Sequence, residues 1–298
     1  MFSDSKNRKI QELKSSLLDA KKIRLLVQHD ESIYDSCSGN KWWKLKYNLL
    51  RAKELKHTKI VTFGGAFSNH ILATAAACNK MGFQSVGVIR GEELGKFLNP
   101  TLLKAKSLGM EFHFVDRETY RRKDDIDWTT AFNKCFILPE GGTNELAVKG
   151  CEEFLCTADF DVVCCSVGTG GTLSGVINSL QKNQFAIGFS ALKNAGFLKD
   201  EIGRFVESTN WDLKLDAHYG GYAKMTKELV DFMNDFKANF NIPLDPIYTA
   251  KLFKAVFDLI ENDYFEAGKK ILLVHSGGLQ GVEGMNQKLK CKGWVIAS

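Results

Sequence analysis

The hydrophobic positions of the chain form two patterns that alternate. Short, nearly continuous apolar runs are typical of buried strands, whereas apolar residues three or four positions apart are typical of amphipathic helices. The runs predict strands or extended segments at residues 23–27, 59–63, 84–89, 111–115, 135–138, 161–166, 185–192, 211–215 and 270–275. The helical spacing predicts helices at residues 6–20, 41–55, 68–81, 100–108, 145–156, 172–180, 225–240 and 249–263, a polar helical stretch near 117–134, and a helix soon after residue 194.

This alternation of strands and helices predicts one fold class. Repeated strand–helix units with continuous apolar strands form α/β proteins, in which helices flank open parallel sheets. The chain has four prolines, no low-complexity linker and no repeat of fixed period. Two lobes would therefore have to be interleaved along the chain and could not follow one another like beads.

Composition narrows the classes of function. The 298 residues carry a formal net charge of +5, which suits an anionic ligand but is too small to indicate nucleic acid. The first residues lack the apolar stretch of a signal peptide, and no apolar run reaches the roughly 20 residues that span a bilayer. We expect a cytoplasmic protein with no membrane partner and no nucleic-acid partner.

The eight cysteines and six histidines show no metal-binding spacing. No C-x-x-C or H-x-x-x-H pair occurs, and several cysteines stand inside apolar runs. We interpret the cysteines as small buried residues in a reducing compartment, and we predict no metal. His70 and His275 stand in segments of interest, but a lone histidine is more often a hydrogen-bonding residue than a ligand.

Two lysines open the helix that the pattern predicts from residue 41. Lys41 and Lys44 follow a Ser-Gly-Asn turn, and their spacing places them on one helical face. A helix N-terminus attracts phosphate, and a desolvated lysine loses basicity and can form a Schiff base. Lys41 is therefore a candidate to carry a cofactor aldehyde, and Lys44 to hold that cofactor's phosphate. The alternative is a solvated lysine pair on a surface helix.

A glycine-rich loop at residues 168–172 joins a buried strand to a helix. Its sequence, Gly-Thr-Gly-Gly-Thr, makes it a candidate phosphate cradle, because glycines let backbone N–H groups crowd an anion. A plain tight turn is the alternative. The loop is not a Walker A motif, since no Gly-Lys-Ser/Thr follows, and it lacks the acidic residue about 20 positions further on that a dinucleotide site requires.

Other loops at strand ends carry candidate residues as well. In the loop at 64–70, Ser68 or Asn69 can cap the following helix, or the loop can hold a substrate carboxylate with Ser68 facing the reacting carbon. Spacing does not separate these two readings. Since ligands of open α/β sheets bind at the carboxyl ends of strands, these loops and Lys41 indicate a phosphorylated ligand in one shared cleft. The further loops are 139–144, 244–251 and 275–278.

Six motifs between residues 38 and 278 match one family in order. They are Ser-Gly-Asn-Lys-x-x-Lys-Leu, Gly-Gly-x-x-Ser-Asn-His, Pro-x-Gly-Gly-Thr-Asn, Gly-Thr-Gly-Gly-Thr, Leu-Asp-Pro-x-Tyr-Thr and His-Ser-Gly-Gly. The chain resembles the pyridoxal-phosphate enzymes of the tryptophan-synthase-β fold type (fold type II), and among them the D-cysteine desulfhydrase/1-aminocyclopropane-1-carboxylate deaminase family. The resemblance implies a smaller lobe, residues 45–147, inserted into a larger cofactor-binding lobe of residues 1–44 and 148–298.

The resemblance also implies roles for individual residues. Lys41 would hold pyridoxal 5′-phosphate and move the substrate's α-proton. Ser68 would bind the substrate carboxylate and assist proton transfer, and Tyr248 would act as an acid or base. Asn69 would contact the cofactor ring near its 3′-oxygen, and Thr249 would hydrogen-bond the pyridine nitrogen. The residues implied to hold the phosphate are Lys44, Gly168, Thr169, Gly170, Gly171 and Thr172.

The residue after the tyrosine separates two branches of this family. The cyclopropane deaminases place a glutamate where this chain has Thr249. A neutral hydroxyl does not enforce protonation of the pyridine nitrogen, which suits β-elimination of a good leaving group such as thiolate. The resemblance thus implies conversion of D-cysteine and water to pyruvate, ammonia and hydrogen sulfide. The alternatives are a deaminase of 1-aminocyclopropane-1-carboxylate, another small-amino-acid deaminase or racemase, and a protein that binds the cofactor without turnover.

Two positions beside the expected site depart from the family pattern. Trp43 stands where the family usually has arginine, and Phe67 stands where many members have glutamine. Both positions bear on the identity of the substrate. The resemblance further implies a homodimer that acts on a small amino acid.

Overall fold

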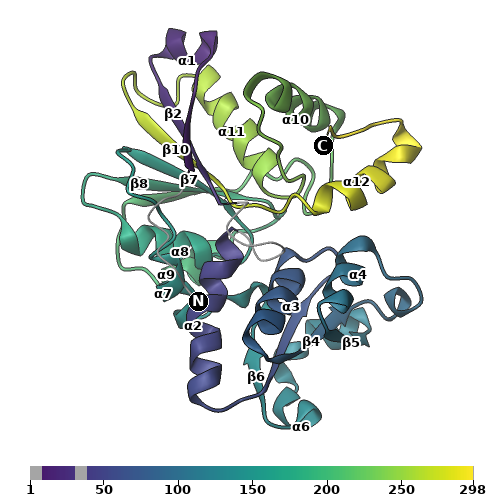
Figure 1. Ribbon diagram of the computed structural model, residues 1–298. Helices are drawn as coiled ribbons and strands as arrows, with labels where there is room; N and C mark the ends of the chain where they lie inside the picture. Colours follow the sequence, from purple (N-terminus) through teal and green to yellow (C-terminus); the bar gives the residue numbers. More distant parts are fainter. Residues whose placement is uncertain (1–8, 31–38, 298) are drawn as a thin grey trace.

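Two β-sheets flanked by helices make up the protein (Figure 1). The computed structural model describes residues 9–30 and 39–297. The start of the Ser-Gly-Asn-Lys motif, Ser38, and one of the eight cysteines, Cys37, lie outside the described residues. The predicted α/β class with open, mostly parallel sheets is confirmed.

The elements follow the predicted alternation of strands and helices. The strands of the described residues are β1 (Lys9–Leu13), β2 (Arg24–His29), β3 (Lys59–Gly64), β4 (Gln84–Arg90), β5 (Met110–Val115), β6 (Cys135–Leu138), β7 (Val162–Val167), β8 (Phe185–Ser190), β9 (Trp211–Lys214) and β10 (Lys270–His275). The α-helices are α1 (Ser16–Lys21), α2 (Asn40–Glu54), α3 (Asn69–Met81), α4 (Pro100–Ser107), α5 (Arg117–Arg121), α6 (Trp128–Phe132), α7 (Glu145–Cys151), α8 (Gly171–Ser179), α9 (Leu198–Gly203), α10 (Lys227–Phe240), α11 (Thr249–Glu261) and α12 (Gly281–Leu289).

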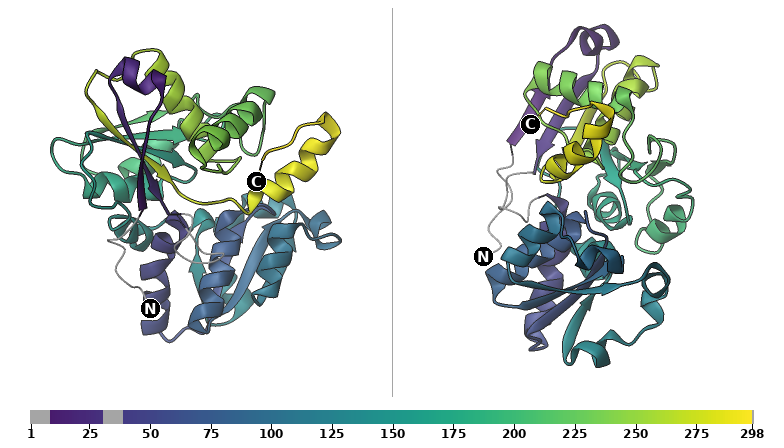
Figure 2. Two further views of the ribbon diagram at one scale, coloured as in Figure 1. Left: turned by 45° about the horizontal axis from the view of Figure 1, so that its top comes forward. Right: turned by 90° about the vertical axis from the view of Figure 1, so that its right-hand side faces the viewer.

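The two sheets differ in size and in the helices that cover them. The larger sheet has the order β1-β2-β10-β7-β8-β9 and is parallel except for β1. The smaller sheet has the order β5-β4-β3-β6 and is parallel throughout. Helices lie on both faces of the larger sheet, so its central strands are buried on both sides, as the continuous apolar run of β7 predicts (Figure 2).

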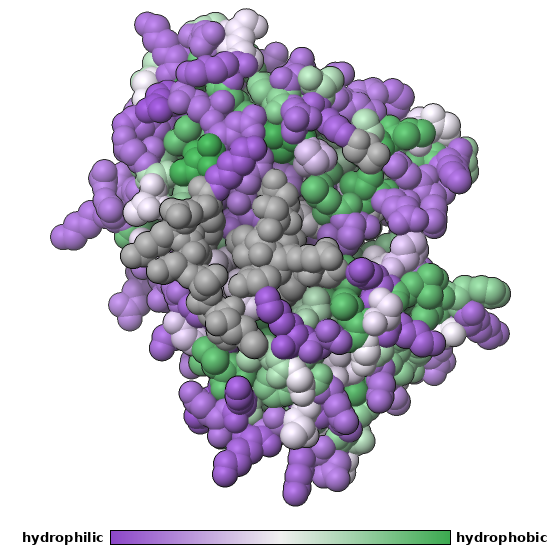
Figure 3. All heavy atoms as spheres, in the orientation of Figure 1, coloured by the Kyte–Doolittle hydropathy of each residue, from purple (hydrophilic) through white to green (hydrophobic). Residues whose placement is uncertain are grey.

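The carboxyl ends of the parallel strands of both sheets face the region between the sheets (Figures 1 and 2). The strands of the smaller sheet all fall within residues 59–138. The lobe boundaries at 44/45 and 147/148 stay a prediction. On the face shown in Figure 3, hydrophilic side chains cover most of the described surface, and hydrophobic side chains appear in separate patches.

The helix predicted over residues 6–20 is wrong at residues 9–13 and right at its end, where residues 16–20 fall in α1. Residues 9–13 form β1, which pairs antiparallel with β2, and Leu13 is buried opposite Leu25. Glu12 on β1 accepts two hydrogen bonds from the Arg24 guanidinium on β2. Ser15 then caps the short α1 by accepting from Leu18 N. The apolar spacing that imitates one helix is divided by this cap, and pairing with β2 outweighs local helix propensity.

Three further segments differ from the prediction. The helix predicted over 145–156 ends at Cys151, because the side chain of Gln28 donates to Phe154 O and accepts from Cys156 N, which removes those backbone groups from a helical ladder. The polar stretch near 117–134 is divided into α5 and α6, each with its own aspartate N-cap, Asp116 and Asp127. Helix α12 was not predicted, since two glycines, at positions 281 and 284, lower its helix propensity.

Most of the cysteines are buried as small core residues, as predicted. Cys78, Cys135, Cys151, Cys156, Cys164 and Cys165 are buried, and Cys291 is exposed. The described residues contain no cluster of three or more histidine, cysteine, aspartate or glutamate side chains that could hold a metal ion. Within the same residues no helix has the length and apolarity to cross a membrane.

Close helix contacts fix α2 against the larger sheet. A Cβ atom on Gly150 of α7 would lie 2.0 Å from the carbonyl oxygen of Trp43 on α2. A Cβ atom on Gly175 of α8 would lie 2.4 Å from Cys151 Cβ. Because these distances are far below van der Waals contact, only glycine lets α2, α7 and α8 approach this closely. The three helices together place the start of α2 beside the start of α8.

We therefore expect Gly150→Ala to lower the free energy of unfolding by about 2 kcal/mol or more, since the methyl group meets rigid backbone. Gly203→Ala is the matched control, because Gly203 is exposed at the end of α9 and a Cβ atom added there would meet no other atom within 4 Å. Urea denaturation of both variants checks this. Equal stabilities of the two variants would contradict the close contact between α2 and α7.

Candidate active site

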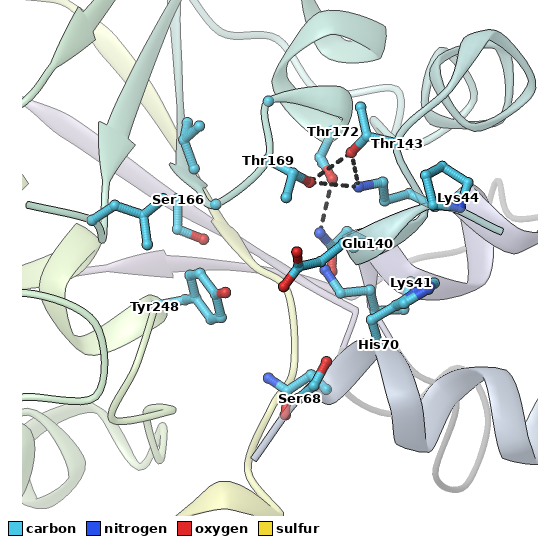
Figure 4. Close-up of a pocket in the computed structure, with 18 of the residues that line it drawn as sticks. Lys41, Lys44, Ser68, His70, Glu140, Thr143, Ser166, Thr169, Thr172 and Tyr248 are labelled. Atoms are coloured by element: carbon cyan, nitrogen blue, oxygen red, sulfur yellow. Dashed lines mark hydrogen bonds between the residues drawn. The ribbon is translucent and has the colours of Figure 1, made fainter. Parts of the chain in front are cut away.

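One cavity of about 1190 Å³ collects the candidate residues (Figure 4). Its walls come from the start of α2 and from the loops that follow β3, β6, β7 and β10, so both sheets contribute. Of the residues predicted for the site, those that line the cavity are Lys41, Lys44, Ser68, Asn69, Gly168, Thr169, Gly170, Thr172 and Tyr248.

The start of α2 is held at the cavity by a glycine contact. Gly39 precedes the helix with φ of +67°, a conformation that glycine adopts without strain. A Cβ atom on Gly39 would lie 1.8 Å from the carbonyl oxygen of Ser276, in the loop after β10. Any larger residue would push α2 away from that loop. The glycine of the Ser-Gly-Asn-Lys motif is thus required by packing, and it sets the position of Lys41.

The two candidate lysines of α2, Lys41 and Lys44, are withdrawn from water. Lys44 is 1% exposed, and burial, with the charge of Lys41 added, lowers the pKa of Lys44 to about 7. The Lys41 side chain is only partly buried, but its amine lies deep enough that loss of water lowers its pKa as well. A neutral lysine amine is a nucleophile, so the surroundings prepare Lys41 to bind an aldehyde. The alternative of a solvated surface pair does not fit this burial.

Threonine hydroxyls join Lys44 to two loops. Lys44 Nζ donates to Thr143 Oγ1 at 2.7 Å and to Thr169 Oγ1 at 3.2 Å, and these two hydroxyls lie 2.6 Å apart (Figure 4). Beside them, Asn40 Nδ2 donates to Thr172 Oγ1 at 2.8 Å. An amine, an amide and three hydroxyl groups therefore converge at the turn between β7 and α8.

That turn has the backbone geometry of an anion cradle. Gly170 has φ of +82°, and α8 begins without a side-chain cap. A Cβ atom on Gly171 would lie 2.8 Å from the Thr143 side chain and 3.3 Å from Lys44 Cε, so only glycine leaves the first N–H groups of α8 accessible. Free N–H groups, the helix dipole and a buried amine form a donor set that suits a phosphate dianion.

The turn after β3 presents the start of α3. Ser68 caps this helix by accepting from Ile71 N at 3.4 Å, and it also lines the cavity. The next residue, Asn69, accepts a hydrogen bond on Oδ1 from Gln280 Nε2 at 2.9 Å. Ser68 is therefore a helix cap that also lines the cavity, and its predicted contact with a substrate carboxylate stays a prediction.

His70 is a hydrogen-bonded histidine with one free nitrogen. Its Nε2 lies 2.7 Å from Thr62 Oγ1, and Thr62 donates its only hydroxyl proton to Leu138 O. Nε2 must therefore carry the proton, which leaves Nδ1 as an acceptor with no partner among the described residues. Burial, and then the charges of Lys41 and Lys44, hold the pKa of His70 well below its ordinary value.

Tyr248 reaches the cavity from the larger sheet. A Cβ atom on Gly168 would lie 3.2 Å from Tyr248 Oη, so the hydroxyl lies at the glycine-rich turn between β7 and α8. In Figure 4 this hydroxyl points toward Lys41 from the opposite side of the cavity. Burial, and then the neighbouring Tyr222, raise the pKa of Tyr248 well above its ordinary value. The rings of Tyr222 and Tyr248 are 6.0 Å apart, edge to face.

Asp245 fixes the backbone on which Tyr248 stands. Its Oδ1 accepts from Tyr248 N and from Thr249 N, and burial raises its pKa to about 6. Thr249 is fully buried, and its hydroxyl accepts from Asp245 N at 2.7 Å. Thr249 and Gly171 do not line the cavity. The predicted contact of Thr249 with a pyridine nitrogen stays a prediction.

Several cavity residues were not assigned from the sequence. Thr143 lies in the quoted Pro-x-Gly-Gly-Thr-Asn motif, but nothing in that motif indicates that its hydroxyl binds Lys44. Tyr222 follows a Gly-Gly pair, which indicates a loop but does not indicate that the loop reaches the cavity. Glu140 lies in the loop after β6, and Arg90 is the last residue of β4. Both line the cavity. Sequence spacing carries no information on these loop contacts.

Fold and site together define an enzyme class, α/β enzymes that hold a phosphorylated cofactor between two sheets through a buried lysine and a glycine-rich turn. Comparison with known families agrees: the family described as "Pyridoxal-phosphate dependent enzyme" matches residues 17–277, and the chain belongs to it. Its cofactor is pyridoxal 5′-phosphate, whose aldehyde and phosphate fit the Lys41 amine and the donor set around Lys44.

Relatives place the chain among deaminase and desulfhydrase homologues. A Thermotoga maritima protein provisionally named a 1-aminocyclopropane-1-carboxylate deaminase is 31% identical, over 90% of this chain and 92% of its own length. The Arabidopsis thaliana mitochondrial bifunctional D-cysteine desulfhydrase/1-aminocyclopropane-1-carboxylate deaminase is 26% identical, over 87% of this chain and 73% of its own. A solved structure of an ACC deaminase homologue has a TM-score of 0.84 and 25% identity, over 95% of this chain and 93% of that one.

The low pKa of Lys44 predicts a pH dependence of stability in the cofactor-free protein. Between pH 7 and about 10 the unfolded chain binds a proton at this lysine that the native state does not, so stability from this group rises with pH across that window. We expect Lys44→Met to be stabilised relative to wild type near pH 7, with an advantage that shrinks toward pH 10.

Urea denaturation of the two cofactor-free proteins between pH 6 and 10 measures this. Lys53→Met, an exposed lysine on the same helix, is the control and should give a difference from wild type that is independent of pH. If the difference in free energy of unfolding between Lys44→Met and wild type is also independent of pH, the pKa of Lys44 is not lowered in the native state.

Proposed function

We propose that this enzyme catalyses β-elimination from D-cysteine, consuming water and releasing pyruvate, ammonia and hydrogen sulfide. The coarser activity, pyridoxal-phosphate-dependent deamination or desulfhydration, follows from the family; the substrate is our proposal. The observation that supports it most is the juxtaposition, in one cavity, of the Lys41 amine withdrawn from water and the Tyr248 hydroxyl at the turn after β7.

The cofactor supplies an electron sink that makes the α-proton of a bound amino acid acidic. We propose that Lys41 would bind the cofactor's aldehyde and, once the substrate's amine has displaced it from that aldehyde, would take the α-proton as a general base. Its lowered pKa keeps a share of the amine neutral, as a base requires. Lys44, Thr143 and Thr169 with the N–H groups at the start of α8 hold the phosphate and fix the cofactor's position.

The substrate is oriented by the opposite wall of the cavity. The start of α3 offers N–H groups and the Ser68 hydroxyl to the substrate carboxylate, and Asn69 offers its amide to the cofactor ring. Tyr248 holds its proton at neutral pH, as tyrosines do, and its hydroxyl faces the cavity, so it is placed to donate a proton to a departing thiolate. The ring of Tyr222 packs edge to face against the ring of Tyr248.

Thr249 supports D-cysteine over the cyclopropane substrate. The cyclopropane deaminases that this chain resembles carry a charged glutamate at this position, whereas this chain carries a neutral threonine whose hydroxyl accepts from Asp245 N and does not line the cavity. Elimination of thiolate needs less delocalisation of the carbanion than opening of a carbon ring. The relatives named as 1-aminocyclopropane-1-carboxylate deaminases make that deaminase activity the second candidate. We further propose a cytoplasmic homodimer, as the family resemblance implies.

A substrate panel tests this proposal. We expect the holoenzyme to release pyruvate and sulfide from D-cysteine in equal amounts, and to act on L-cysteine and 1-aminocyclopropane-1-carboxylate far more slowly. Pyruvate, 2-oxobutanoate, ammonia and sulfide are measured in parallel.

The variant Tyr248→Phe gives the matched comparison. We expect it to keep the near-visible absorption of the bound cofactor and to lose about 10²-fold or more of the elimination rate, as loss of a general acid does. Formation of 2-oxobutanoate as the main product would favour the cyclopropane deaminase. A holoenzyme that shows cofactor absorption but turns over no panel member would support a binding protein.

A further inference from the structure

Helix α12 presents one row of residues toward the turn after β3. Gln280 immediately precedes the helix, and Gly284 and Lys288 follow at intervals of four, so the three lie on one helical face. Figures 1 and 2 show α12 extending from the side of the larger sheet to a place beside α4 of the smaller one, and the two helices are in contact. The row therefore stands between the two sheets.

Each member of the row contacts the turn at residues 65–69. Gln280 Nε2 donates to Asn69 Oδ1 at 2.9 Å. A Cβ atom on Gly284 would lie 3.1 Å from the ring of Phe67, and Lys288 Nζ lies 3.9 Å from the centre of the same ring. Helix α12 thus contacts two cavity-lining residues of the turn. It hydrogen-bonds to Asn69, and it packs Gly284 and the Lys288 ammonium group against the ring of Phe67.

The other faces of α12 are anchored in the larger sheet's core. Val282, Met285 and Leu289 are buried in the core cluster that also contains Ile296. Asn286 donates to Ile296 O at 3.0 Å and accepts from Ile296 N at 2.8 Å, which ties the chain after the helix back onto it. Helix α12 is therefore anchored to the core of the larger sheet, whereas the turn that its row of residues contacts follows β3 of the smaller sheet.

The hydrogen bond from Gln280 also sets the orientation of the Asn69 amide. Because Oδ1 accepts from Gln280, the NH₂ group must point the other way. A Cβ atom on Gly278 would lie 2.9 Å from that Nδ2 and 2.8 Å from Asp245 Oδ2, which has no hydrogen-bond partner among the described residues. The amide thus presents its donor group toward Gly278, which lines the cavity.

We propose that Gln280 and Phe67 are positioning residues, through which α12 holds the turn at 65–69 in register with the larger sheet. Gln280 orients Asn69 toward the cofactor, and Phe67, seated on Gly284 under Lys288, sets the distance of Ser68 from the reacting atoms. This inference rests on the proposed roles of Ser68 and Asn69. It assigns a function to Phe67, one of the two departures from the family pattern.

Variants of Gln280 test the first part. We expect Gln280→Leu to weaken pyridoxal 5′-phosphate binding about five-fold, as loss of one orienting hydrogen bond does, and to shift the absorption maximum of the bound cofactor. Gln280→Glu should be worse, because a carboxylate can only accept from the Asn69 amide and so turns its NH₂ group away from the cofactor. Gln287→Leu, an exposed glutamine on the same helix, is the matched control.

Variants of Phe67 test the second part, with D-alanine as the probe, since it binds without a leaving group. We expect Phe67→Ala to weaken D-alanine binding, measured by the change in cofactor absorption, about ten-fold while the affinity for the cofactor stays within about two-fold. Phe67→Leu should recover most of the lost D-alanine affinity, because leucine again packs an apolar side chain against Gly284.

Two results would overturn the proposal. One is wild-type cofactor affinity and spectrum in both Gln280 variants, and the other is wild-type D-alanine binding in Phe67→Ala. Neither readout needs turnover, so a wild-type enzyme that fails on the substrate panel would refute D-cysteine as substrate without deciding this test. Conversely, unchanged Gln280 and Phe67 variants of an enzyme that desulfhydrates D-cysteine would refute the positioning role alone.

Discussion

The site depends on two lysine amines buried beside a helix N-terminus that has no side-chain cap. Lys41 and Lys44 lie one helical turn apart on α2, and placing two cations together out of water is costly unless an anion joins them. The pKa values of both lysines are lowered, and the hydroxyl groups of Thr143 and Thr169 accept hydrogen bonds from Lys44. A phosphate dianion at the start of α8 would relieve the same cost, and binding of the cofactor there would then also stabilise the native state.

The fold brings these groups together through contacts that exclude side chains. Gly39 packs on the backbone at Ser276, Gly150 packs on Trp43, and Gly171 leaves the start of α8 open beneath Lys44. Each contact joins elements far apart in the sequence, namely α2 to the loop after β10, α2 to α7, and α8 to the loop after β6. The amines are thus positioned by close backbone approach, and the smaller sheet supplies the opposite wall.

Much of this arrangement could be predicted from the sequence, for physical reasons that differ by residue. The buried strand β7 has a strong local signal, whereas the glycine turn after it and the pair Lys41 and Lys44 point to a site only when they are read together with the other loops at strand ends. The strand β1 was mistaken for helix, because its partner β2 decides its conformation. Helix α12 was missed, since its two glycines lower its local helix propensity, and one of them, Gly284, serves a contact with Phe67 that local spacing does not show. Thr143 and Tyr222 reach the cavity through loop geometry, which spacing does not encode.

The most direct test of the central claim is to locate the covalently bound cofactor. The holoenzyme is reduced with borohydride, digested, and its peptides are analysed by mass spectrometry, in parallel with Lys41→Ala. The account predicts that the reduced pyridoxal phosphate is attached at Lys41, and that Lys41→Ala shows neither the attachment nor the near-visible absorption of the bound cofactor. Attachment at Lys44 or another lysine, or an unchanged spectrum in Lys41→Ala, would contradict it.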